Sequence, residues 1–151
     1  MKCMKALIQR VSSAKVEVEG MVIGEINMGL LIFVCAVKGD TDQDLEYLVK
    51  KISQLRIFSD EKGKMNRSIM EIQGAALVVS QFTLAASTRR GNRPSFDAAE
   101  STARARMMYE AFIQKLKETG IIVRSGKFAA TMAVSLVNDG PVTIVIDSRE
   151  E

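Results

Sequence analysis

The stretch "SLVNDGPVTIVID", residues 135–147, has the pattern of a β-strand on both sides of a glycine and a proline. Apolar residues recur at every second position on each side of the interruption, at Val134 and Leu136 and again at Val142, Ile144 and Ile146, which suggests strands. The middle is typical of a turn, because Asn, Asp and Gly favour turns and Pro141 has no N–H to donate to a sheet. The sequence therefore predicts two strands joined by an ordinary hairpin turn or by a tight turn with a cis bond before Pro141.

Strands outnumber helices in the rest of the chain. Predicted strands cover residues 6–11, 15–19, 21–26, 29–37, 75–84, 121–124 and 129–138. The spacing of apolar residues predicts one helix that is capped by Asp40 or Thr41 and extends to Leu55, and a second helix from about residue 100 to residue 119. Because hairpins dominate, we expect an α+β fold with mostly antiparallel sheets and two main helices, in a single domain over residues 1–151.

The composition restricts the chemistry that is possible. The chain has 151 residues, 47% of them hydrophobic, and its net charge of +3 is too mild to identify a nucleic-acid binder by itself. Histidine is absent, which excludes a Ser-His-Asp triad, a Cys-His pair and histidine metal ligands within this chain. Glycine-rich nucleotide motifs and CxxC spacing are also absent, so we expect no metal and no cofactor.

The cysteines and the short apolar runs indicate the compartment. Cys3 lies near the start and Cys35 within an apolar run, so a disulfide is not expected and a reducing environment is favoured. The longest strong apolar run, Leu30–Val37, is far shorter than a membrane span, and the first residues show no signal-peptide pattern. We therefore expect a cytoplasmic protein with no membrane partner.

The stretch "SQFTLAA", residues 80–86, follows an apolar strand and offers functional groups at its end. Ser80 and Thr83 carry hydroxyls, Gln81 carries an amide, and Phe82 has a flat ring on which a base can stack. The alternative is a strand that simply becomes polar as it leaves the core.

A basic loop, "ASTRRGNRPSF", covers residues 86–96 and is called the arginine loop below. Arg89, Arg90 and Arg93 bring three guanidinium groups close together, and such groups bind phosphates bidentately. Lys127 is a more distant candidate for the same cluster. The alternative is a solvated charged loop without a ligand.

Together these stretches resemble the D-aminoacyl-tRNA deacylase family. The matching segments, in chain order, are "MKALIQRV" (4–11), "GLLIFVCAV" (29–37), "RIFSDEKGKMN" (56–66), "SQFTLAA" (80–86), "RGNRPSF" (90–96) and "VSLVNDGPVTIVID" (134–147). "SQFTLAA" and "NDGPVT" are the two signatures of that family, and the resemblance covers nearly the whole chain. Residues 1–3 lie outside the pattern and are expected to be an N-terminal extension, and Thr131 stands where an aspartate is common.

The resemblance implies a barrel-like fold, layered β/β/α, and a homodimer that hydrolyses the ester joining a D-amino acid to the terminal adenosine of tRNA. It also implies removal of glycine from mischarged tRNA, as part of translation quality control. Gly140 and Pro141 would form a Gly-cisPro motif that reaches into the partner's pocket, and Arg10 and Asn138 would belong to the same selecting unit. An L side chain would strike this motif, whereas a D side chain would point into open space.

The same resemblance implies that Ser80, Gln81 and Thr83 form the catalytic set and that Phe82 stacks on the terminal adenine. From the charge of the arginine loop, we expect its three arginines to contact tRNA phosphates. Thr83 is a candidate nucleophile, but a threonine hydroxyl is weak without an adjacent base. We therefore hypothesise that the ribose 2′-hydroxyl of the substrate helps to activate water. Thr83 would orient the ester, and backbone N–H groups near Phe82 and Thr83 would stabilise the oxyanion.

Two rival functions stay open at this point. The chain could be a hydrolase of small D-amino acid esters that ignores RNA, although the arginine loop and Phe82 favour a nucleic acid. It could also be a non-catalytic RNA-binding module, which the positive net charge and the missing histidine allow.

Overall fold

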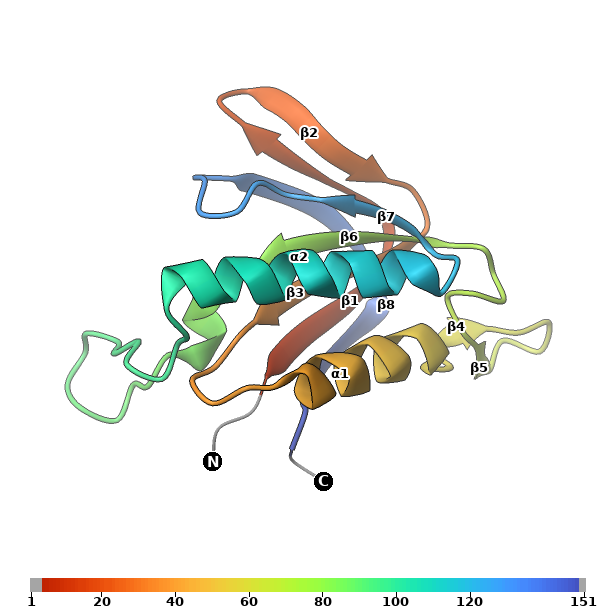
Figure 1. Ribbon diagram of the computed structural model, residues 1–151. Coiled ribbons are helices and arrows are strands. Elements are labelled where there is room, and N and C mark those ends of the chain that lie inside the picture. The colour runs from red at the N-terminus through yellow and green to blue at the C-terminus, as the bar shows by residue number, and fades with distance from the viewer. Residues whose placement is uncertain (1–3, 150–151) are drawn as a thin grey trace.

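The computed structural model describes residues 4–149, and these form two α-helices, one short 3₁₀ helix and eight β-strands (Figure 1). In chain order the elements are β1 (Lys5–Val18), β2 (Met21–Ile26), β3 (Gly29–Cys35), α1 (Asp42–Gln54), β4 (Phe58–Ser59), β5 (Met65–Arg67), β6 (Ala75–Ser80), η1 (Phe82–Ala85), α2 (Thr102–Glu118), β7 (Ile122–Ser125) and β8 (Ala133–Asp147). The predicted α+β class with two main helices is confirmed. The expected N-terminal extension, residues 1–3, lies outside the described residues.

One curved, six-stranded sheet carries the fold. Its order is β2-β1-β3-β6-β7, and β8 pairs with β1. β1 is antiparallel to β2, β3 and β8, whereas the β3–β6 and β6–β7 pairs are parallel. The two ends of the sheet approach each other closely, since a Cβ on Gly24 of β2 would lie 2.9 Å from the carbonyl oxygen of Ser125 in β7. Glycine therefore lets the sheet close almost into the expected barrel.

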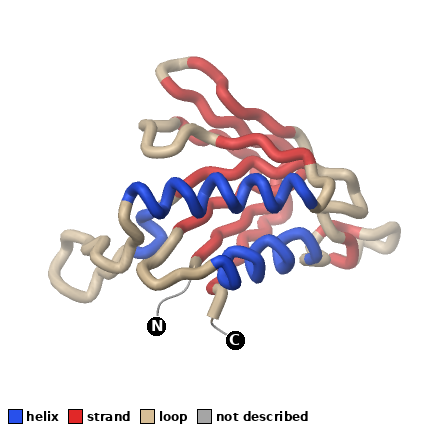
Figure 2. Tube along the Cα trace, in the orientation of Figure 1, coloured by secondary structure: helices blue, strands red, loops and turns tan. Residues whose placement is uncertain are grey.

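Both α-helices cover one face of this sheet (Figure 2). α1 buries Leu45, Leu48 and Ile52, which recur at helical spacing. α2 buries Phe112 and Leu116 in the same way. These side chains belong to the main core between the helices and the sheet, and they account for the α layer.

A second core lies on the opposite face of the same strands. Leu30 and Ile32 of β3 belong to the main core, whereas the residue between them, Leu31, belongs to the second. Leu77 and Val79 of β6 also point to the second core. The apolar run that begins at Leu30 is therefore covered on both faces, because neighbouring side chains of a strand point in opposite directions.

β8 is a single strand, so the hairpin interpretation of its sequence is wrong. Its two halves do not pair with each other; both pair with β1, which is one strand of 14 residues where two shorter strands were predicted. The pairing passes from Gln9–Thr143 to Val11–Asn138, so residues 139–142 bulge out opposite one residue of β1. This four-residue segment is called the 139–142 bulge below. A long β1 decides the outcome because it holds both halves of β8.

The predicted strand over residues 75–84 is too long. β6 ends at Ser80, and the chain then turns into the 3₁₀ helix η1. A turn joins β4 to β5, and in it Asp60 accepts hydrogen bonds from the backbone N–H groups of Lys62 and Lys64. The change of direction after Ser80 matters for function, since it exposes Phe82 and Thr83 instead of burying them in a ladder.

The described ends of the chain are tied together beside α1. The N–H of Met4 donates to Ser148 Oγ at 2.9 Å, and Arg149 forms an ion pair with Asp44 at 2.6 Å. Cys35 is buried, and its Sγ lies 3.5 Å from the Ala36 carbonyl oxygen and 3.6 Å from that of Phe82. In the part of the chain that the structure describes, no helix is long and apolar enough to cross a membrane.

Candidate active site

A cavity of about 470 Å³ opens where β6 gives way to η1. Its walls come from the ends of β3 and β6, the first turns of α2, and the segment that leads into β8. The lining residues include Val34, Cys35, Ser80, Gln81, Phe82, Glu100, Thr102, Ala105, Tyr109, Phe128 and Met132. Three of the four residues that the "SQFT" sequence singled out are therefore brought to one cavity.

Gln81 fixes the end of β6 and contacts Thr83. Its backbone N–H donates to the carbonyl oxygen of Val34 at 2.9 Å, which extends the parallel β3–β6 ladder by one bond. Its side-chain Nε2 donates to Thr83 Oγ1 at 2.5 Å. Thr83 itself is exposed and is not among the lining residues. The threonine hydroxyl therefore faces an amide donor, which cannot take its proton.

The first N–H groups of η1 are available to a ligand. Among residues 4–149, neither the Phe82 N–H nor the Thr83 N–H donates a hydrogen bond, as is usual for the first turn of a helix. The Phe82 side chain is 55% exposed, and its ring meets Phe96 edge-to-face with centroids 5.1 Å apart. Phe96 thus supports a ring that keeps an open face at the edge of the cavity.

Tyr109 and Phe128 form an opposite wall that the sequence analysis did not identify. The Tyr109 hydroxyl donates to backbone carbonyls, at 3.1 Å from Val78 and 3.2 Å from Gly126, and its burial raises the pKa of Tyr109 to about 12. The rings of Tyr109 and Phe128 lie 5.8 Å apart. Tyr109 belonged to the apolar pattern of α2, so its sequence signal was that of an ordinary core residue.

Glu100 is a carboxylate in the cavity wall that the sequence also gave no reason to select. Its side chain is only 12% exposed, and both oxygens are engaged. Oε1 accepts from the backbone N–H of Ser101 at 2.8 Å, and Oε2 accepts from Arg104 Nε at 3.1 Å. Both oxygens of this carboxylate therefore already accept hydrogen bonds within the chain.

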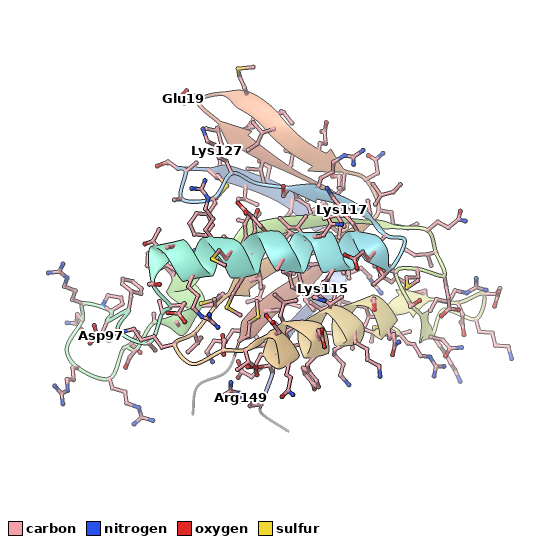
Figure 3. The ribbon with its side chains drawn as sticks, in the orientation of Figure 1. Glu19, Asp97, Lys115, Lys117, Lys127 and Arg149 are labelled. Carbon is pink, nitrogen blue, oxygen red and sulfur yellow. The ribbon has the colours of Figure 1, made fainter. Side chains whose placement is uncertain are left out.

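The arginine loop lies outside the cavity. Arg89, Arg90 and Arg93 are exposed, and none of them lines the cavity. The loop is part of the connection between η1 and α2, which extends away from the body of the molecule. Figure 3 labels Asp97, which lies on this connection just after the loop. Within residues 4–149 these three guanidinium groups form no ion pair, so they face solvent.

The 139–142 bulge is held by Arg10 and Asn138. Arg10 Nε donates to the carbonyl oxygen of Asp139 at 2.9 Å, and its Nη1 donates to that of Ile57 at 2.7 Å. Asn138 Oδ1 accepts from the Val142 N–H at 3.1 Å, and its Nδ2 donates to the Val142 carbonyl at 3.0 Å. These side chains replace the ladder bonds that the bulge gives up.

Gly140 and Pro141 form the tip of the bulge and are exposed. The peptide bond between them is cis, as predicted. Gly140 has a φ of +147°, and a Cβ there would lie 2.8 Å from the Val142 backbone nitrogen, so the position requires glycine. Neither residue lines the cavity of its own chain. Among the described residues, no group of three or more histidine, cysteine, aspartate or glutamate side chains is placed to hold a metal ion.

Comparison with known proteins places the chain among relatives of similar length. A family model described as D-Tyr-tRNA(Tyr) deacylase matches residues 7–147. A protein of Dinoroseobacter shibae named D-aminoacyl-tRNA deacylase is 58% identical over 141 residues, which cover 93% of this chain and 97% of that protein. A protein of Aquifex aeolicus with the same name is 54% identical over 147 residues, covering 97% and 99%.

Two solved structures share the fold of this chain. A structure titled c-Myc DNA Unwinding Element Binding Protein is 41% identical, has a TM-score of 0.90, and matches over 94% of this chain and 97% of its own. A probable eukaryotic D-amino acid tRNA deacylase shows the same fold with a TM-score of 0.80 at 17% identity, over 95% and 98% of the two chains. The chain therefore belongs to the D-Tyr-tRNA(Tyr) deacylase family and is a hydrolase of that family.

Proposed function

We propose that this protein hydrolyses the ester bond between a D-amino acid and the terminal adenosine of tRNA, in the cytoplasm, as a step of translation quality control. The observation that carries the proposal is the position of Ser80, Gln81 and Phe82 in one cavity at the end of β6. The cavity volume, about 470 Å³, suits a single aminoacylated nucleoside. The exposed ring of Phe82 offers a stacking surface for adenine at its edge.

Selection between mirror-image esters would come from a second copy of the chain, so the working unit is a homodimer. Gly140 and Pro141 protrude and lie outside the cavity of their own chain, which leaves the cavity of a partner as their place of action. The Gly140 carbonyl would accept a hydrogen bond from the ammonium group of the substrate. With the ammonium fixed, an L side chain strikes the bulge, whereas a D side chain or the hydrogen of glycine does not. The enzyme would therefore also hydrolyse glycyl-tRNA.

Hydrolysis would depend on the substrate's own 2′-hydroxyl, which helps to activate water. Thr83 faces the Gln81 amide, which cannot take its proton, and both oxygens of Glu100 already accept hydrogen bonds within the chain. The unpaired N–H groups of Phe82 and Thr83 would bind the oxyanion that forms on the ester carbonyl. Gln81 and Thr83 would orient the ester, and Ser80 would contact the adenosine.

The test compares D-Tyr-tRNA with the same tRNA ending in 2′-deoxyadenosine, and wild type with Thr83→Ala. We expect the 2′-deoxy substrate to be hydrolysed at least about 100-fold more slowly, the usual effect of removing an acid or base, and Thr83→Ala to lose about tenfold or less. Near-total loss in Thr83→Ala with little effect of the 2′-deoxy substitution would make Thr83 the nucleophile. Equal hydrolysis of a free D-tyrosine ester and of D-Tyr-tRNA would favour the small-ester hydrolase instead.

A second candidate function, beside hydrolysis, is binding of nucleic acid that carries no aminoacyl ester. It is favoured by the solved relative whose title describes a protein that binds a DNA unwinding element. The exposed guanidinium groups of the arginine loop are compatible with such binding. This activity would be measured as binding of uncharged RNA or of DNA, and an absence of such binding would leave hydrolysis as the one function.

A further inference from the structure

Arg106 stands at the rim of the cavity on α2. The residues of α2 that line the cavity are Thr102, Ala105 and Tyr109. Arg106 follows Thr102 by four positions and precedes Tyr109 by three, so it lies beside this stripe on the helix surface. Its guanidinium carbon is 5.4 Å from the centroid of the Phe128 ring, and Phe128 lines the cavity. A cation is therefore fixed over an aromatic ring at the cavity mouth.

Arg106 is free to bind a ligand, whereas its neighbour Arg104 is not. Arg104 Nε donates to Glu100, and its Nη2 donates to the carbonyl oxygen of Asp40 at 2.6 Å. Within residues 4–149, the one ion pair of Arg106 is with Glu110, at 3.6 Å, and both side chains are more than half exposed. An exposed pair of this kind contributes about 0–1 kcal/mol, so a phosphate can displace the carboxylate.

Lys127 supplies a second cation on the other side of Phe128. The Ala130 N–H donates to the Lys127 carbonyl at 3.2 Å, which closes a tight turn, and Ala129 within it has a φ of +63°. Ala129 and Ala130 line the cavity, while Lys127 is exposed. Figure 3 shows Lys127 on the loop beside α2, on the side away from Lys115. The turn thus directs Phe128 toward the cavity and leaves the lysine at its margin.

We propose that Arg106 and Lys127 bind the phosphodiester that joins the terminal adenosine of the RNA to the preceding nucleotide. The inference rests on the proposed function and adds the path that the attached RNA takes from the cavity across the protein surface. A cavity of about 470 Å³ takes one nucleoside, so the first phosphate of the attached RNA must lie at the mouth. An arginine stacked on a ring is held ready for bidentate phosphate binding, because less side-chain freedom is lost. The RNA therefore crosses the first half of α2 and the 127–130 turn, and the arginine loop contacts it less or not at all.

The experiment separates phosphate binding from binding of the nucleoside. Wild type, Arg106→Ala, Lys127→Ala and the double variant are assayed on D-Tyr-tRNA and on the D-tyrosyl ester of adenosine, which has no phosphate. We expect the double variant to raise KM for D-Tyr-tRNA about tenfold, equivalent to about 1.4 kcal/mol, and to leave KM for the adenosine ester unchanged. The slope of log KM for D-Tyr-tRNA against the logarithm of the salt concentration should decrease by about 0.7 for each phosphate contact that is lost.

Lys117→Ala is the matched control, because it removes the same charge from the last turn of α2, away from the cavity. Arg106→Lys should recover part of the affinity, since it keeps the charge without the planar guanidinium. A triple variant of Arg89, Arg90 and Arg93 to alanine should change KM for D-Tyr-tRNA less than the double variant does. Thermal unfolding of each variant verifies that it is folded.

The proposal is overturned if the double variant affects both substrates equally, since Arg106 would then only support Phe128. It is also overturned if Lys117→Ala or the triple variant has the larger effect on D-Tyr-tRNA. A separate measurement compares the affinities for a short RNA ending in adenosine and for adenosine alone. If wild type hydrolyses neither ester, the proposed function fails, and weaker RNA binding with unchanged adenosine binding in the double variant still supports the phosphate site.

Discussion

The Nε of Arg10 donates a hydrogen bond to the carbonyl oxygen of Asp139 at 2.9 Å, although 128 residues separate the two in the chain. Arg10 lies on β1 opposite the 139–142 bulge, between Gln9, which pairs with Thr143, and Val11, which pairs with Asn138. Its other donor reaches the Ile57 carbonyl, so the arginine joins the 139–142 bulge to the segment that precedes β4. The side chain is 11% exposed, which makes the contact a structural brace for the exposed Gly140 and Pro141.

Arg10→Ala should loosen the bulge and lower the preference for D over L substrates. The change removes the donor of the exposed Asp139 carbonyl and of the partly buried Ile57 carbonyl, and a typical hydrogen bond contributes about 0.5–1.5 kcal/mol. Hydrolysis rates of D-Tyr-tRNA and L-Tyr-tRNA measure the effect, with thermal unfolding alongside. Arg56→Ala is the control, because Arg56 donates to the Asn66 carbonyl in a similar way but on an exposed hairpin. If Arg10→Ala keeps the wild-type preference for D over L substrates, the contact between Arg10 and the bulge has no part in selection.

Gly140→Ala should reduce activity more than stability. The added Cβ would lie 2.8 Å from the Val142 nitrogen and 3.2 Å from Arg10 Nη2, and a φ of +147° is one that an alanine avoids. The bulge must therefore shift, and the carbonyl that is proposed to receive the substrate ammonium shifts with it. The measurement is kcat/KM on D-Tyr-tRNA. Gly20→Ala is the control, since Gly20 also has a positive φ but its Cβ would meet nothing within 4 Å. Equal losses in the two variants would mean that backbone strain alone is responsible.

Glu100→Gln should leave most of the activity. Loss of a general base would lower kcat by roughly 10²- to 10⁴-fold. Because we do not assign that role to Glu100, we expect the variant to lose about threefold or less in kcat. The glutamine keeps the shape of the side chain and can still accept from Arg104. A pH profile of kcat accompanies the measurement. A loss of roughly 100-fold or more in kcat, together with a change in the acidic limb of the pH profile, would identify Glu100 as the general base. The role proposed for the substrate 2′-hydroxyl would then be wrong.

Asp40 should make the protein less stable as the pH rises from about 4 to 7. Burial, partly opposed by the hydrogen bond from the Val37 N–H, raises the pKa of Asp40 to about 6. Its Oδ1 is buried and, among the described residues, has no hydrogen-bond partner. Because the pKa of Asp40 is higher in the folded state than in the unfolded state, its contribution to the free energy of unfolding is fully present below the unfolded pKa. This contribution is lost as the pH rises through about 6.

Thermal unfolding across this pH range tests the point, with Asp40→Asn as the variant that cannot titrate. The variant should show a smaller decline in melting temperature than wild type between about pH 4 and 7. An identical decline in both proteins would assign the effect to another group.

Asp44 should act in the opposite direction. The hydrogen bonds from Arg149 hold the pKa of Asp44 well below its usual value, against the cost of its burial. Its contribution is therefore present above the unfolded pKa and is lost as the pH falls below about 4. Asp44→Asn should lower the melting temperature at neutral pH, where wild type has the full ion pair, and the difference should shrink in acid. Glu46→Gln removes an exposed carboxylate of the same helix and should have little effect, because Glu46 forms only a surface pair with Lys115. A constant difference at all pH values would contradict the ionic role.

The spacing of apolar residues along the chain was enough to predict the α+β class, the two helices and most strands. α1 and α2 begin within two residues of the predicted starts, since capping residues and helical spacing are local signals. The "SQFT" residues were also predictable, because the end of a buried strand is where polar groups become accessible. Tyr109, Phe128 and Glu100 were not, since their role depends on which other segment lies opposite them. The same reason hid Arg106, whose local sequence is that of an ordinary exposed helix face.

The sequence by itself determined that Gly140 and Pro141 interrupt a strand and that histidine plays no part in the chemistry. Only the tertiary structure decided what the interruption becomes. Both halves of β8 pair with β1, so the glycine and the proline are pushed outward as an exposed bulge and are not the turn of a hairpin. The physical reason is that a strand's partner is chosen by contacts between distant parts of the chain, and β1 is long enough to hold both halves.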